Sequence, residues 1–249
     1  MKVVILSGGK GSRLTGIAEP VPKPLINING KPIITRIIEH YCNYGFKDFV
    51  IPVGYKGEMI KNYFQNYDLN NANLKIKFNP NKTVEYDRKF QDLSFQVIDT
   101  GQETLTALRL YKIKKVLSDD TFMLTYGDGI SDVNITKLLE FHISHGKIGT
   151  MTIIRPPGRF GELEVGTNSE ILYFKEKPKI SKGWINGGFF VFNKSFFNYV
   201  SEKNEMLEEI PLNKLSKDNQ LVGYKHDGFW QCIDTPRDLD FFEKNFKDK

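Results

Sequence analysis

Short apolar runs alternate with stretches of helical periodicity in the first half of the chain, and this alternation constrains the fold most strongly. Lys2–Leu6 and Phe49–Val53 have the length and composition of strands that are buried on both faces. Pro32–Tyr44 and Gly57–Asn66, which follow them, carry apolar side chains at helical spacing. Strand–helix units this short are typical of parallel strands joined by helical crossovers. The sequence therefore predicts an α/β fold with a mixed, mostly parallel central sheet flanked by helices.

The pattern changes at Gly149. Glu162–Gly166 and Ile171–Lys175 flank a turn and predict an antiparallel hairpin, and a short helix is expected at Leu207–Leu215. A chain of 249 residues with 40% hydrophobic content can bury one full core. We therefore expect a single domain over residues 1–249, in which residues 149–249 add a small antiparallel extension to residues 1–148.

Charge and cysteine content narrow the class of protein. The net charge of +5 is spread along the chain, which does not favour nucleic-acid binding and suits small polyanions such as nucleotides and sugar phosphates. The chain enters a strand at Lys2 without a signal peptide, and no apolar run reaches membrane length. Cys42 and Cys232 match no metal or redox spacing, which indicates two reduced thiols. These features predict a cytoplasmic protein with no nucleic-acid or membrane partner.

The loop after the first strand has the composition of an anion-binding site. Ser7–Arg13 contains three glycines in four residues, and glycines let backbone N–H groups surround a phosphate. Arg13 adds a planar cation, and Lys23 adds a point charge between two prolines that stiffen its backbone. Leu14 stands where a dinucleotide fingerprint needs glycine, and Gly9-Lys10-Gly11 breaks the P-loop pattern. For the glycines alone, a solvated surface turn remains the alternative.

Two carboxylates are candidate metal ligands. Asp128 follows the apolar run Phe122–Tyr126, and open α/β sheets bind their ligands at the carboxyl ends of such strands. Asp234 precedes a closing helix predicted at Pro236–Phe246. The alternatives are that Asp128 is only a turn residue and that Asp234 caps the closing helix.

Two other features have less specific interpretations. His142 and His145 do not complete a metal site, and we expect ordinary surface histidines. Asn79–Asp92 is polar and turn-rich. It is either a solvated excursion, or a lid or arm that reaches another subunit.

Nearly the whole chain resembles the sugar-1-phosphate nucleotidyltransferase family, which implies a Rossmann-like fold. Pro156–Gly161 and Phe229–Gln231 are similar to the branch of that family that transfers a cytidylyl group. The motifs that carry the resemblance are, in chain order, Gly8-Gly-Lys-Gly-Ser-Arg-Leu14, Pro22-Lys-Pro-Leu25, Gly54-Tyr-Lys-Gly57, Asp99-Thr-Gly101, Tyr126-Gly-Asp-Gly129, Pro156-Pro-Gly-Arg-Phe-Gly161, Glu176-Lys-Pro178, Asn186-Gly-Gly-Phe-Phe190 and Gly228-Phe-Trp-Gln231 with Asp234-Thr235.

The resemblance implies a nucleotide-binding part in residues 1–148 and a sugar-binding part in residues 149–249. Arg13, Lys23 and Asp128 would be the catalytic residues, and Asp128 with Asp234 would hold Mg²⁺. The implied sugar-phosphate-binding residues are Gly161, Glu176, Lys177, Asn186 and Gly187. The implied nucleotide-binding residues are Leu6, Ser7, Gly8, Gly9, Lys10, Gly11, Ser12, Arg13, Lys23, Thr104, Arg109 and Gly127.

The implied activity is Mg²⁺-dependent transfer of a cytidylyl group from CTP to glucose 1-phosphate, in a homo-oligomer such as a hexamer. Because both substrates are anions, the protein needs charge and in-line geometry rather than a nucleophile of its own. Thr106-Ala107-Leu108-Arg109 departs from the Thr-Gly-Gly-Arg pattern of the family, which leaves open another nucleotide or another sugar or polyol phosphate. A non-catalytic nucleotide sensor of the same fold is the alternative from a different class.

Overall fold

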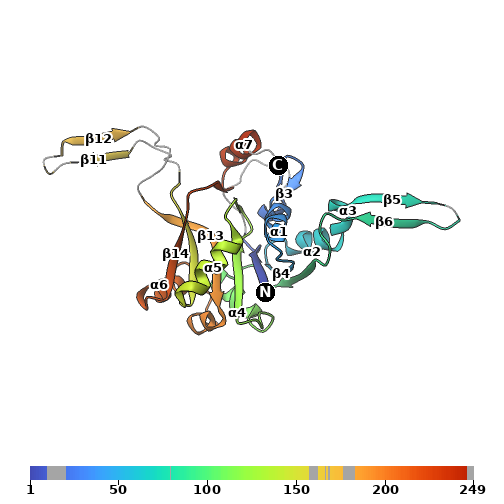
Figure 1. The fold of residues 1–249 in the computed structure, drawn as a ribbon, viewed down its shortest axis with the longest axis horizontal. Coiled ribbons are helices and arrows are strands. Elements are labelled where there is room, and N and C mark those ends of the chain that lie inside the picture. The colour runs from blue at the N-terminus through green and yellow to red at the C-terminus, as the bar shows by residue number, and fades with distance from the viewer. Residues whose placement is uncertain are drawn as a thin grey trace.

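The computed structural model describes residues 1–9, 21–78, 80–156, 162–165, 167, 169–175 and 183–245. Within these residues, a seven-stranded sheet runs through the centre of the molecule (Figure 1). In order across the sheet, the strands are β14 (Leu221–His226), β10 (Gly149–Ile154), β13 (Ile185–Asn193), β8 (Thr121–Tyr126), β1 (Lys2–Leu6), β4 (Asp48–Val53) and β7 (Ser94–Asp99). The β8–β1, β1–β4, β4–β7 and β10–β14 pairs are parallel. β13 is antiparallel to both of its neighbours. The predicted mixed, mostly parallel sheet is therefore confirmed.

Helices cover both faces of this sheet, and the alternating side chains of β1 show why both faces are apolar. Val3 and Ile5 join one buried cluster, whereas Val4 and Leu6 join another. One cluster includes side chains of α1 (Ile33–Asn43), α2 (Gly57–Gln65), α5 (Ile135–His145) and α7 (Pro236–Asn245). The other includes side chains of α4 (Thr106–Ile113), α6 (Pro211–Lys217) and the 3₁₀ helix η2 (Lys194–Tyr199). A strand buried on both faces is what the apolar run in the sequence predicts.

Short two-stranded sheets are attached to this core. The turn between β2 and β3 contains Asn29 and Gly30 at φ values of 49° and 79°, the left-handed conformations that a type I′ hairpin needs. β11 and β12 form the predicted antiparallel hairpin, which extends away from the body of the molecule (Figure 1). The strands of these sheets are β2 (Asn27–Ile28) with β3 (Lys31–Pro32), β9 (Gly129–Ser131) with β15 (Trp230–Cys232), and β11 (Glu162–Val165) with β12 (Ile171–Lys175).

A further hairpin, β5 (Asn73–Lys77) with β6 (Thr83–Asp87), projects from the edge of the molecule that carries α3 (Tyr67–Asn71) (Figure 1). We call it the arm. Its second strand lies within Asn79–Asp92, the segment that the sequence analysis interpreted as either a solvated excursion or a lid or arm. Almost every residue of the arm is exposed. Most of its surface is therefore free to contact another molecule.

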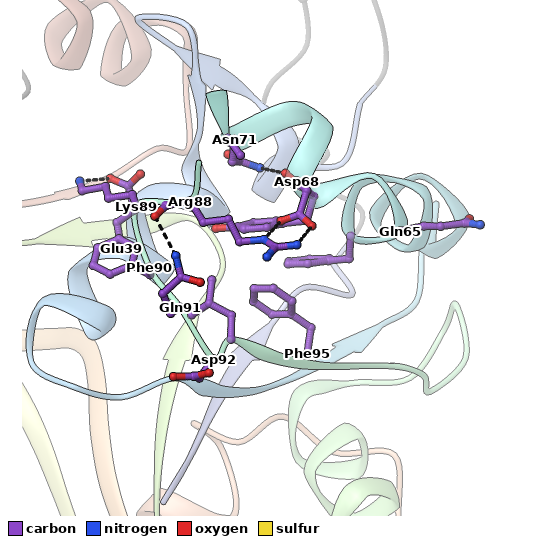
Figure 2. A pocket seen from close by; sticks show the side chains of 14 residues that line it. Glu39, Gln65, Asp68, Asn71, Arg88, Lys89, Phe90, Gln91, Asp92 and Phe95 are labelled. Atoms are coloured by element: carbon purple, nitrogen blue, oxygen red, sulfur yellow. Dashed lines mark hydrogen bonds and ion pairs between the residues drawn. The ribbon is translucent and has the colours of Figure 1, made fainter. Parts of the chain in front are cut away.

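Ion pairs and aromatic rings hold the base of the arm against the body (Figure 2). Arg88 donates two hydrogen bonds to Asp68, at 2.7 and 2.6 Å, and Lys89 Nζ lies 3.2 Å from Glu39 Oε2. These residues line a cavity of about 370 Å³ that also includes Phe95. Because exposed ion pairs contribute little to stability, they set the direction of the arm more than they stabilise it.

Two details of the fold correct the sequence analysis. α6 begins at Pro211 rather than at Leu207, in agreement with the preference for proline in the first turn of a helix. His142 is buried and lies 2.8 Å from Thr150 Oγ1 and 3.0 Å from Asn193 Oδ1, so the prediction of a surface histidine was wrong. Within the described ranges, no helix is both long enough and apolar enough to cross a membrane.

Candidate active site

The carboxyl ends of β1 and β8 lie side by side and lead into the two loops of the candidate site. Leu6 pairs with Tyr126, and the N–H of Gly127 donates to the carbonyl oxygen of Leu6 at 2.9 Å. A Cβ atom on Gly127 would lie 2.9 Å from that carbonyl oxygen and 2.9 Å from Pro24 Cγ. Only glycine therefore lets the β8 loop pass this close to the β1 loop.

One lysine and two aspartates meet beside these loops. Lys23 begins the 3₁₀ helix η1 (Lys23–Leu25), and its Nζ lies 3.3 Å from Asp128 Oδ2 and also contacts Asp234 Oδ1. Asp234 reaches this position because β15 pairs with β9 and the N–H of Ile233 donates to the carbonyl oxygen of Asp128 at 2.9 Å. All three side chains are mostly buried. The structure thus brings together three residues that the sequence analysis assigned to catalysis or metal binding.

The electrostatics of this cluster fit a divalent cation. Burial raises the pKa of Asp128; the Lys23 ammonium opposes this effect and the Asp234 carboxylate adds to it. Burial alone would lower the pKa of Lys23, but its hydrogen bond to Asp234 and the two negative charges outweigh burial and raise it. Two adjacent buried carboxylates repel each other, and a cation relieves that repulsion. Carboxylate oxygens are ligands that Mg²⁺ prefers, and it commonly uses one or two of them.

A cysteine is also part of the cluster. The Sγ of Cys232 and one carboxylate oxygen each of Asp128 and Asp234 all lie within 4.8 Å of one another. Burial raises the pKa of the Cys232 thiol, and the two carboxylates raise it further. Of these donors, the carboxylate oxygens are the hard ligands that suit Mg²⁺.

A cavity of about 290 Å³ next to the cluster is lined by many of the residues that were predicted to bind the nucleotide. Thr104, Leu105 and Thr106 contribute to one wall. The predicted residues that the structure places around it are Leu6, Ser7, Gly8, Gly9, Lys23, Thr104, Arg109, Gly127 and Asp128.

Arg109 lines this cavity, but its hydrogen bonds go to the protein itself. Its buried guanidinium donates to the carbonyl oxygens of Val53 at 2.9 Å, Gly101 at 3.0 Å and Gly8 at 2.9 Å, and to Thr100 Oγ1 at 2.6 Å. Gly8, Val53 and Thr100 follow or end β1, β4 and β7. Arg109 therefore joins three strand ends and fixes the backbone of the glycine loop.

The replacements for the two family glycines do not enter the cavities. Ala107 is buried in the core on the inner side of α4. Ala107 and Leu108 are both absent from the described linings of the two cavities at this site. The substitution of Gly-Gly by Ala107-Leu108 therefore does not narrow the described space for a ligand.

A second cavity of about 750 Å³ adjoins the first, and its lining includes residues that were predicted to bind the sugar phosphate. Asn186 and Gly187 line it, and the carbonyl oxygen of Gly187 accepts a hydrogen bond from Trp230 Nε1 at 2.7 Å. Tyr126 and Asp128 belong to both linings. Ligands in the two cavities would therefore meet at the carboxylate cluster.

Several predicted site residues lie outside the described residues. Their assigned roles stay predictions: they are Lys10, Gly11, Ser12, Arg13, Gly161, Glu176 and Lys177. The sequence analysis missed Tyr126, Met206 and Glu208 as cavity-lining side chains. Tyr126 stood within a quoted motif and could have been found from it, whereas Met206 and Glu208 lie in no motif.

A strand-end glycine loop, paired carboxylates and two joined cavities define an enzyme that works on phosphorylated ligands. Residues 2–247 match the family model described as nucleotidyl transferase, and the chain belongs to that family. It is 39% identical over 244 residues to the glucose-1-phosphate cytidylyltransferase of Salmonella typhimurium, covering 98% of this chain and 95% of the relative. It is 40% identical over 242 residues to the probable glucose-1-phosphate cytidylyltransferase of Bacillus subtilis, covering 96% and 93%. The resemblance stated from the motifs is therefore confirmed.

A solved structure supports the fold. HddC from Yersinia pseudotuberculosis superposes with a TM-score of 0.70 at 21% identity, covering 99% of both chains. Mannose-1-phosphate guanyltransferase of Gibberella zeae is more distant in sequence, at 31% identity over 96% of this chain and 62% of the relative. The protein is therefore a nucleotidyltransferase. The relatives that are 39% and 40% identical to it are named as a glucose-1-phosphate cytidylyltransferase and a probable glucose-1-phosphate cytidylyltransferase.

Proposed function

We propose that the protein transfers a cytidylyl group from CTP to α-D-glucose 1-phosphate and releases CDP-glucose and pyrophosphate. The supporting observation is that two cavities meet at the Lys23–Asp128–Asp234 cluster. The relatives that are 39–40% identical over nearly the whole chain supply the identity of the substrates.

The chemistry requires charge more than covalent participation by the protein. A phosphate oxygen of the sugar phosphate attacks the α-phosphorus of CTP, a P–O bond forms, and the bond to the pyrophosphate leaving group breaks. Lys23 lines the smaller cavity and offers an ammonium next to Asp128, which lines both cavities, and Arg13 and Lys177 are proposed as further cations. Preorganised charge of this kind stabilises phosphoryl-type transition states without a protein nucleophile.

Asp128 and Asp234 are the residues that would hold a divalent cation, which we propose is Mg²⁺. When bound, such a cation neutralises phosphate oxygens and helps to orient the nucleotide. The Lys23 ammonium compensates the same two carboxylates from the protein side. Lys23 therefore limits the repulsion within the cluster before any ligand arrives.

The remaining assignments follow the two cavities. We propose that the loop Leu6–Arg13, with Thr104 and Gly127, binds the nucleotide, and that Arg109 supports this loop from behind. Asn186 and Gly187 are proposed to bind the sugar phosphate, together with Gly161, Glu176 and Lys177. Residues 1–148 then supply most of the nucleotide site and residues 149–249 most of the sugar site.

Two alternatives differ from this proposal. The protein could use another nucleotide or another sugar or polyol phosphate, and a structure of HddC is described as a complex with GMP-PN. The protein could instead be a nucleotide sensor without activity. A sensor that only binds nucleotide could lose the two candidate metal ligands, so the presence of both carboxylates beside Lys23 favours the enzyme.

A panel of nucleoside triphosphates tested against sugar 1-phosphates, read by pyrophosphate release, tests the proposal. We expect the highest kcat/KM with CTP and glucose 1-phosphate. Faster turnover with another pair would reassign the substrates. No release with any pair would favour the sensor.

A further inference from the structure

Glu208 lines the sugar-side cavity from a segment that none of the motifs covers. It lies between η2 and α6 and is half-buried. The same cavity holds Asn186 and Gly187, the described residues proposed to bind the sugar phosphate. Glu208 therefore places a carboxylate where the substrate carries hydroxyl groups.

Hydrogen bonds within the protein hold this carboxylate in place. The Tyr126 hydroxyl donates to Glu208 Oε1, and Thr106 Oγ1 donates to Glu208 Oε2 at 3.3 Å. Asn186 Nδ2 in turn donates to the Tyr126 hydroxyl at 3.3 Å. Each link directs a donor toward Glu208, so the network keeps Glu208 as an acceptor.

Glu208 retains capacity to accept further hydrogen bonds. A carboxylate has about four lone-pair sites, and Tyr126 and Thr106 occupy about two of them. Among the described residues, no lysine, arginine or histidine forms an ion pair with Glu208. An acceptor with this negative charge disfavours a nearby phosphate and favours neutral hydroxyl donors. Glu208 is therefore suited to bind hydroxyl groups, whereas the Lys23 ammonium is suited to bind phosphate.

The segment that carries Glu208 is fixed to the start of α4. The N–H of Leu105 donates to Asn204 Oδ1 at 2.7 Å, and the N–H of Ala107 donates to the carbonyl oxygen of Glu205 at 3.1 Å. The N–H of Leu207 donates to Thr106 Oγ1 at 2.8 Å. These hydrogen bonds join residues 204–207 to residues 105–107 at the start of α4. The backbone that leads into Glu208 is therefore fixed in position.

We propose that Glu208 determines sugar specificity by accepting hydrogen bonds from hydroxyl groups of the hexose 1-phosphate. The inference rests on the proposed function, because it assigns a further residue to the sugar side of that site. It also assigns different parts of the larger cavity to the phosphate and to the sugar ring of the substrate. Asp128 and Asp234, which contact the Lys23 ammonium, line the part of this cavity where the phosphate would bind, while Glu208 selects the sugar ring.

Glu208→Gln tests the proposal, because the amide keeps the shape while it removes the charge and turns one acceptor into a donor. We expect KM for glucose 1-phosphate to rise by roughly 10- to 100-fold, the loss typical of a hydrogen bond to a charged group. KM for CTP should change less than about twofold. Glu209→Gln, at the exposed neighbouring glutamate, is the matched control and should leave both KM values unchanged.

A series of deoxyglucose 1-phosphates, each lacking one hydroxyl group, separates recognition from structural support. Wild-type protein should disfavour the sugar that lacks the recognised hydroxyl, and Glu208→Gln should lose that discrimination for this sugar only. Such coupling between a side chain and one ligand group is the signature of direct contact. Glu208→Asp, which keeps the charge on a shorter side chain, supplies a second variant if Glu208→Gln does not fold.

Unchanged discrimination against every deoxy sugar in both variants, or equal increases in the two KM values, would overturn the role of Glu208. Calorimetric titration of glucose 1-phosphate without nucleotide gives a readout that does not depend on turnover. Wild-type binding that is lost in Glu208→Gln would support the role of Glu208 even if no nucleotide is transferred. Absence of both binding and turnover in wild-type protein would instead reject the proposed function, and this inference with it.

Discussion

Replacing Arg109 by methionine tests whether a buried guanidinium joins the strand ends below the glycine loop. Methionine keeps much of the apolar stem but removes the five hydrogen bonds to Val53, Thr100, Gly101, Gly8 and Gln102. Hydrogen bonds to charged groups contribute about 1.5–3 kcal/mol each, and they are not additive when they share one donor group. Because the carbonyl oxygens lose a buried partner, we expect the free energy of unfolding to fall by about 3–5 kcal/mol.

Urea unfolding measures this loss, and calorimetry should show Tm lower by roughly 6–20 °C for a chain of this size. Arg109→Lys should be intermediate, since one ammonium cannot reach all five acceptors. Arg88→Met is the matched control, because Arg88 is exposed and its guanidinium contacts only surface partners among the described residues, the Asp68 carboxylate and the Tyr86 ring. It should leave Tm nearly unchanged. A loss below about 1 kcal/mol in Arg109→Met would refute the structural role of Arg109.

Four further predictions concern the metal, the sugar phosphate, the assembly and pH. Asp128→Asn should lower kcat by roughly two to four decades; near-normal turnover in saturating Mg²⁺ would make Asp128 only a turn residue. Lys177→Ala should reduce kcat/KM by roughly 30- to 1000-fold, through KM for glucose 1-phosphate more than KM for CTP; equal effects on both KM values would place Lys177 at the transferred phosphate. Light scattering should show a homo-oligomer, which the exposed arm supports; a fully active monomer would contradict this. Burial lowers the pKa of His142 below its ordinary 6.5, so the stability that its neutral form provides is present above pH 6.5 and lost as the pH falls below it. His142→Gln should therefore flatten the decline of unfolding free energy between pH 7 and 5.5 in urea titrations, and an identical pH dependence in both proteins would exclude His142 as the cause.

The parts of the fold that the sequence predicted are those that local periodicity determines. β1, α1, β4 and α2 each begin and end within two residues of the predicted bounds. Their apolar spacing alone specifies both the element and its buried face. The strand β6 was not predicted, because Thr83–Asp87 is almost entirely exposed and, although Val84 and Tyr86 share one face, it forms a strand through its pairing with β5. Alternation over five exposed residues is a weaker signal than the buried apolar runs that predicted β1 and β4.

The candidate site shows the same division. Motif resemblance identified Lys23, Asp128 and Asp234 and paired the two aspartates, but the contact of Lys23 with both of them depends on the β9–β15 pairing, which no spacing in the sequence indicates. Glu208 could not be found because a single glutamate outside any motif is indistinguishable from a surface charge. His142 was misassigned for a related reason, since Thr150 and Asn193, which bury its ring, belong to other elements.

The Lys23–Asp128–Asp234 cluster also links substrate binding to the folding together of segments that are far apart in the chain. Lys23 lies 105 residues from Asp128 and 211 residues from Asp234 along the sequence. A nascent chain that does not yet include Asp234 therefore has a glycine loop but no second carboxylate. A ligand that binds only the assembled cluster stabilises the finished fold by mass action, by about 2.7 kcal/mol at one hundred times its Kd. The abundance of the substrates would then influence how long each newly made molecule survives proteolysis, independently of how fast it turns them over.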